Sequence, residues 1–75
     1  MTKLPAVTGK QVIKALCRDG WKIKSQKGSH VKLIKSGFDY PITVPVHSGK
    51  DVPKGTLDKI IEDSGMTIEK FSRLL

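Results

Sequence analysis

The apolar residues near the amino terminus recur at the spacing of an amphipathic helix. They occupy positions i, i+1, i+4 and i+5, and they are Val12, Ile13, Leu16 and Cys17. Thr8 and Gln11 have capping-box spacing, in which each side chain satisfies the backbone amide of the other residue. Gly20 suits the left-handed position that follows a helix. The pattern therefore predicts a helix over about residues 9–19.

The middle of the chain alternates between apolar and polar side chains in three runs, over residues 21–26, 29–35 and 41–47. The side chains expected to face inward are Trp21, Ile23, Val31, Leu33, Ile42, Val44 and Val46. A period of two with one polar face is typical of an antiparallel sheet that is exposed on one side. Residues 26–28 fit a three-residue hairpin loop, with Gly28 in the left-handed position. We expect a three-stranded antiparallel meander.

Helical spacing returns after the third run. Pro53 suits the first position of a helix, where the missing N–H is no loss, and Gly65 suits its end. Thr67 can cap a last short helix. The inner faces of these two helices are expected to carry Leu57, Ile60, Ile61, Ile68, Phe71, Leu74 and Leu75. The predicted fold class is α+β, a two-layer α-β-β-β-α domain with a short C-terminal helix, and residues 1–75 have room for one such domain.

The chain is strongly basic. Fourteen Lys and Arg against seven Asp and Glu give a formal charge of +7, which favours a polyanionic partner: nucleic acid, an anionic membrane surface or an acidic protein. A lysine-rich surface without any partner is the simpler alternative. A membrane is the weakest of these options because no segment joins a basic face to a Trp/Phe/Leu face, and no apolar run approaches the ~18 residues of a span.

The single cysteine, Cys17, excludes an internal disulfide and fits a reducing, cytoplasmic location. We expect it to be buried in the first helix as a small hydrophobic residue. The N-terminus lacks the apolar segment of a signal peptide. The two histidines are too few for a metal site, and the aspartates lie at unsuitable positions. The sequence therefore predicts neither a metal nor another cofactor.

The predicted register places a histidine at the centre of the exposed face. Pairing the inward-facing residues of the second and third strands puts His30 opposite His47. A hairpin loop over residues 26–28 puts Lys24 opposite His30, and Lys32 is the next outward-facing residue on the same strand. We therefore expect His30 to be flanked by Lys24, Lys32 and His47.

This arrangement suits the cleavage of RNA. A neutral imidazole accepts protons near pH 7, and ammonium groups bind phosphate oxygens and stabilise developing negative charge. The 2′-hydroxyl of RNA lies beside the scissile phosphodiester, so a base such as His30 can turn the substrate into its own nucleophile without a metal. His47 or a water molecule is a candidate proton donor, and the candidate phosphate contacts are Lys24, Lys32, Lys50 and Lys54. If only the residue spacing is considered, the simpler interpretation is that His30 faces solvent on its strand and has no catalytic role.

The chain resembles the HicA toxins from about Thr8 to Leu75. The resemblance rests on the order and spacing of Gly20-Trp21, Gly28-Ser29-His30, Val44-Pro45-Val46-His47-Ser48-Gly49-Lys50, Gly55-Thr56-Leu57 and Glu69-Lys70-Phe71. It implies a double-stranded-RNA-binding-like fold and a metal-independent mRNA interferase, the toxin of a type II toxin–antitoxin module. It also implies that the histidine of Gly-Ser-His, His30, is catalytic, and that a HicB-type antitoxin binds the toxin and blocks this residue.

Two other classes of function share the fold and the charge. A non-catalytic double-stranded-RNA-binding module would read duplex shape through phosphates and 2′-hydroxyls, and it would hold RNA uncut. A plain interaction protein would use its basic surface to meet an acidic partner. The toxin interpretation partly contains the second alternative, because an antitoxin must cover the same positive face.

Overall fold

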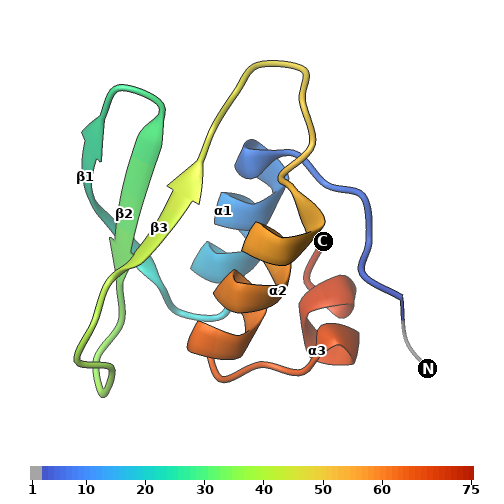
Figure 1. Cartoon of the computed structure of the whole chain (residues 1–75). Coiled ribbons are helices and arrows are strands. Elements are labelled where there is room, and N and C mark those ends of the chain that lie inside the picture. Colours follow the sequence, from blue (N-terminus) through green and yellow to red (C-terminus); the bar gives the residue numbers. More distant parts are fainter. Residues whose placement is uncertain (1–2) are drawn as a thin grey trace.

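Three strands form one antiparallel sheet, and helices cover one of its faces (Figure 1). The structure is a computed structural model in which residues 3–75 are described. The elements are α1 (Gly9–Arg18), β1 (Lys22–Lys27), β2 (His30–Ile34), β3 (Ile42–Pro45), α2 (Lys54–Asp63) and α3 (Ile68–Arg73). The strands follow the order β1-β2-β3 in the sheet, as a meander does. The predicted α+β fold, with its three-stranded antiparallel sheet and short C-terminal helix, is confirmed.

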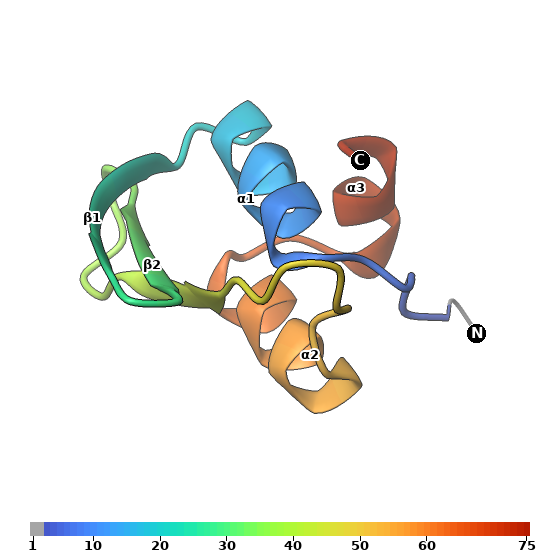
Figure 2. The same cartoon turned by 90° about the horizontal axis from the view of Figure 1, so that it is seen from above.

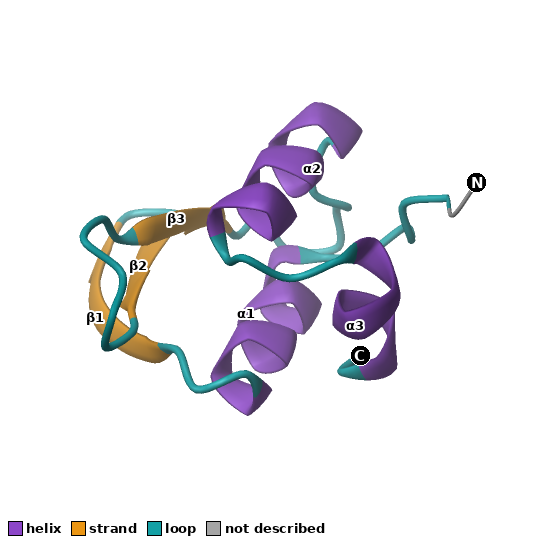
Figure 3. Ribbon diagram, turned by 90° about the horizontal axis from the view of Figure 1, so that it is seen from below, coloured by secondary structure: helices purple, strands orange, loops and turns teal. Residues whose placement is uncertain are grey.

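The helices and the sheet form separate layers. Seen from above and from below, the sheet stands on one side, α1 and α2 face it, and α3 lies beyond α1 (Figures 2 and 3). The core between the layers is apolar, and its largest fully buried side chains are Trp21, Phe71, Leu16, Leu33, Leu57, Val12 and Val44. The second face of the sheet carries no helix and remains open to solvent.

The helix α1 begins and ends close to where the sequence predicts. The Gln11 backbone N–H donates to Thr8 Oγ1 at 3.3 Å, and the Thr8 N–H donates to Gln11 Oε1 at 2.8 Å, which completes the capping box. Gly20 ends the turn after the helix with φ of 103°. The buried stripe, however, comprises Val12, Ala15 and Leu16, and Cys17 is exposed. The prediction of a buried Cys17 was wrong because the apolar stripe turns toward Ala15 at i+3 rather than toward i+5.

The second and third helices also carry their predicted inner faces, with small differences at the ends. Pro53 is the N-cap of α2 rather than its first helical residue. Thr67 caps α3 by accepting a hydrogen bond from the Lys70 N–H at 3.1 Å. Leu75 is 43% exposed instead of packed inward, because it follows the C-cap residue Leu74 and so lies outside the helix.

The predicted sheet register was wrong at both pairings. The hairpin loop contains two residues, Gly28 and Ser29, so that Lys27 pairs with His30. A bulge between Ile23 and Ser25 takes Lys24 out of the ladder.

On the other side of β2, His30 pairs with Pro45 and Val31 with Val44, two residues from the predicted match. The third strand ends before Val46, whose N–H donates to Ser29 O at 2.6 Å. Val46 is only half-buried and packs against the core from outside the sheet. Neither Lys24 nor His47 therefore lies opposite His30.

The first strand, β1, is an edge strand of the sheet. All six of its residues are exposed, and Ile23 is 56% exposed although its partner Leu33 is fully buried. Ile23 shares the face of its partner Leu33, as predicted, but the expectation that it is buried in the core was wrong, because the side chains of this edge strand remain exposed. Trp21, which precedes β1, is buried as expected at 1% exposure.

Candidate functional site

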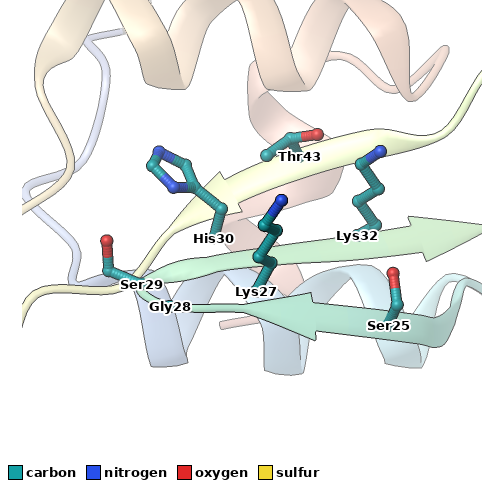
Figure 4. Close-up of a pocket in the computed structure, with 7 residues that line it drawn as sticks. All are labelled: Ser25, Lys27, Gly28, Ser29, His30, Lys32 and Thr43. Carbon is teal, nitrogen blue, oxygen red and sulfur yellow. The ribbon is translucent and has the colours of Figure 1, made fainter.

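A shallow hollow of about 640 Å³ opens on the face of the sheet that the helices leave uncovered. All three strands and the β1–β2 turn contribute to it. Its lining residues are Ser25, Lys27, Gly28, Ser29, His30, Lys32 and Thr43. Figure 4 shows the side chains of Lys27, His30 and Lys32 rising from the same side of the sheet.

Alternation along β2 puts His30 in this hollow. Val31 and Leu33 are 4% and 0% exposed because they pack against the helices, so His30 and Lys32 must point the other way. Cross-strand pairing then adds neighbours in two rows. The first row is Lys27, His30 and Pro45, and the second is Ser25, Lys32 and Thr43.

The hollow is positively charged and contains no carboxylate. Lys27 and Lys32 are its cations, and Ser25, Ser29 and Thr43 add hydroxyl groups. Within residues 3–75, every ion pair joins side chains outside the hollow, such as Asp19 with Lys35 and Lys70. The two ammonium groups are therefore not neutralised by the protein, and they attract an anion. Residues 3–75 contain no group of three or more His, Cys, Asp or Glu side chains that could hold a metal ion.

The other predicted site residues lie outside this hollow. Lys24 sits at the β1 bulge, and Lys50 is exposed in the loop before α2. The Lys54 ammonium donates to the Leu4 carbonyl at 2.8 Å, so this lysine fixes the N-terminal segment. His47 follows β3 and lines another cleft, of about 120 Å³, beside the start of α1. Of the predicted set, the structure brings together His30 and Lys32.

The sequence interpretation missed Lys27, the cross-strand partner of His30. A signal for it was present, because a two-residue hairpin of type II′ requires glycine at its first central position. Gly28 has φ of 59°, and no residue other than glycine has a positive φ in the described chain. Choosing this turn instead of a three-residue loop would have placed Lys27 beside His30. Ser25 and Thr43 enter the hollow through the same shift of register.

The fold and this surface define a small basic α+β domain whose open sheet face carries a histidine among cations. Residues 9–66 match the family model described as the HicA toxin of bacterial toxin–antitoxin systems. The match contains the whole sheet, α1, α2 and the hollow. The chain belongs to the HicA toxin family, and this membership implies an antitoxin partner.

The comparison with curated proteins gives no significant match. Among the described residues, no helix has both the length and the apolar composition needed to cross a membrane.

Proposed function

We propose that this toxin is a metal-independent endoribonuclease that cleaves mRNA, with His30 as the general base. The observation that carries the proposal is the position of His30 in an open, cationic hollow without carboxylates. A histidine that only stabilised the fold would be expected in a packed or hydrogen-bonded setting. His30 is exposed, and its neighbours Lys27 and Lys32 carry ammonium groups, which are suited to binding phosphate.

The reaction uses the ribose as the nucleophile. The imidazole of His30 removes the proton of the 2′-hydroxyl, and the 2′-oxygen forms a bond to phosphorus as the bond to the 5′-oxygen breaks. The products are a 2′,3′-cyclic phosphate and a 5′-hydroxyl end. Lys32 lies one row from His30 on the same strand, where its ammonium group stabilises the charge that grows on the phosphate oxygens.

The antitoxin partner is proposed to be of the HicB type and to cover the hollow. A partner with an acidic surface would associate rapidly with this face because the two charges attract each other over long range. Contacts that bury His30 would then determine how long the inactive complex persists.

The test uses the purified protein and a 5′-labelled messenger fragment in buffer with EDTA. We expect cleavage within minutes to hours, fragments with 2′,3′-cyclic phosphate ends, and no cleavage of DNA with the same sequence. DNA binds the same cations but lacks the 2′-hydroxyl, so it is the matched control. RNA that stays bound and uncut would contradict the proposal and favour a non-catalytic RNA-binding module.

A further inference from the structure

The proposed reaction needs a second proton transfer, and the hollow contains a group that can perform it. The 5′-oxygen leaves as a strongly basic alkoxide unless a proton reaches it as the bond breaks. His47 does not line the hollow and instead faces the start of α1. Resting on the proposed function, we propose that Lys27 is the general acid, whose ammonium group protonates the 5′-oxygen.

The position of Lys27 is fixed by the turn that joins β1 to β2. Lys27 and His30 form the pair that closes the two-residue hairpin, and such cross-strand partners lie about 4.5–5.5 Å apart at Cα. The Gln26 side-chain amide donates to the Gly28 carbonyl at 3.2 Å, which braces the turn. In Figure 4 the terminal amine of Lys27 lies between His30 and Lys32.

The attacking and leaving oxygens stand roughly in line on opposite sides of phosphorus. A base and an acid must therefore reach the phosphate from two different directions. His30 comes from β2 and Lys27 from β1, so a phosphate in the hollow meets the imidazole and the ammonium from neighbouring strands. Lys32, one row further along β2, remains available for the non-bridging oxygens.

The protons balance over one turnover. His30 gains the 2′-proton and becomes imidazolium, and Lys27 gives a proton to the 5′-oxygen and becomes a neutral amine. Because both side chains are exposed, exchange with water restores them. Within the described residues, no ion pair or hydrogen bond engages the Lys27 ammonium group, so its protons are free for transfer.

The test separates proton donation from simple charge. Arginine keeps the positive charge but does not give up its proton, so Lys27→Arg removes the acid alone. The substrate is a short RNA containing a cut site mapped with the wild-type protein, made with either oxygen or sulfur at the 5′-bridging position. A thiolate leaves without protonation, so the sulfur substrate does not need the acid.

We expect Lys27→Arg to slow single-turnover cleavage of the oxygen substrate by about 100-fold or more. Its rate on the sulfur substrate should stay within about fivefold of wild type, because that bond breaks without an acid. Lys24→Arg, three residues away on the same strand, is the matched control and should change both rates less than about twofold.

Equal losses of cleavage rate on both substrates would overturn the inference and leave Lys27 an electrostatic role alone. An unchanged rate of Lys27→Arg on the oxygen substrate would also overturn it. Either result leaves the proposed function intact if the wild type cuts RNA and His30→Ala does not. A wild-type protein that cuts no RNA would remove the proposed function itself. Circular dichroism of Lys27→Arg checks the fold of the variant, which the exposed substitution should leave unchanged.

Discussion

The carboxylate of Asp19 holds three parts of the chain together, and its removal should weaken the fold measurably. Asp19 follows α1, and its side chain is only 5% exposed. Its two oxygens accept hydrogen bonds from Lys35 at 3.3 Å and from Lys70 at 3.1 Å. Lys35 follows β2 and Lys70 lies in α3, so the carboxylate ties the third helix to the sheet side of the core.

The expected loss follows from the exposure of the two lysines. A hydrogen bond to a charged group contributes about 1.5–3 kcal/mol when it is buried, and we assign about 1.5 kcal/mol to Lys35, which is 29% exposed. Lys70 is 56% exposed, so solvent screening reduces its share to about 0.5 kcal/mol. Asp19→Asn should therefore lower the free energy of unfolding by about 2 kcal/mol, or Tm by roughly 10 °C for a domain of this size.

The stability lost in Asp19→Asn should depend on pH. Burial of the Asp19 carboxyl raises its pKa, but the hydrogen bonds and charges of Lys70 and Lys35 outweigh burial, so its pKa lies below the ordinary value of 3.8. A carboxyl whose pKa is lowered by folding stabilises the protein above the pKa of the unfolded chain, about 3.9. This stability is lost as the pH falls through the lower, folded pKa. The gap between wild type and Asp19→Asn should narrow below about pH 4.

Urea unfolding followed by circular dichroism at pH 7, 5 and 3 measures this gap. Asp63→Asn is the matched control, because Asp63 pairs with Lys59 at 3.7 Å on an exposed helix surface and should change stability by less than about 0.5 kcal/mol. The expected difference in the free energy of unfolding at pH 7 is about 2 kcal/mol. A difference below about 0.5 kcal/mol between Asp19→Asn and wild type would refute the reasoning. A gap of the same size at pH 3 would refute the pH argument.

Two further predictions concern the junction of sheet and helices and the cysteine. Gly9→Ala should lower the free energy of unfolding by about 1–3 kcal/mol in urea melts, because the new Cβ would stand 2.9 Å from the Val46 Cα and also meet the Pro45 carbonyl. If this variant were as stable as wild type, the backbone of residues 45–46 could not lie so close to Gly9. Cys17 is exposed and should react fully with a thiol reagent under native conditions, whereas a buried thiol would react only on unfolding.

The elements of the fold were predictable because each depends on local signals. The capping box of Thr8, the positive φ of Gly20 and Gly65, and the alternation of β2 are all expressed within a few residues of sequence. The register was not predictable in the same way. It depends on whether the chain turns in two residues or three at Gly28, and both choices place a glycine in the left-handed region.

The candidate site was therefore predicted only in part. His30 and Lys32 belong to the central strand, where burial of the intervening Val31 fixes their direction whatever the register. Lys24 and His47 were placed beside His30 by counting along the neighbouring strands, and an error of register brings a different residue opposite His30. The bulge beside Lys24 carries no clear sequence signal, because neither glycine nor proline occurs within β1.

The proposed function requires that the exposed imidazole of His30 takes part in the chemistry without holding the fold or the RNA together. The direct test measures single-turnover cleavage and RNA affinity for wild type, His30→Ala and His47→Ala. We expect His30→Ala to lose about 100-fold or more in cleavage rate, with an RNA affinity near that of wild type, whereas His47→Ala should cleave within about threefold of the wild-type rate. Undiminished cleavage by pure, folded His30→Ala would contradict it.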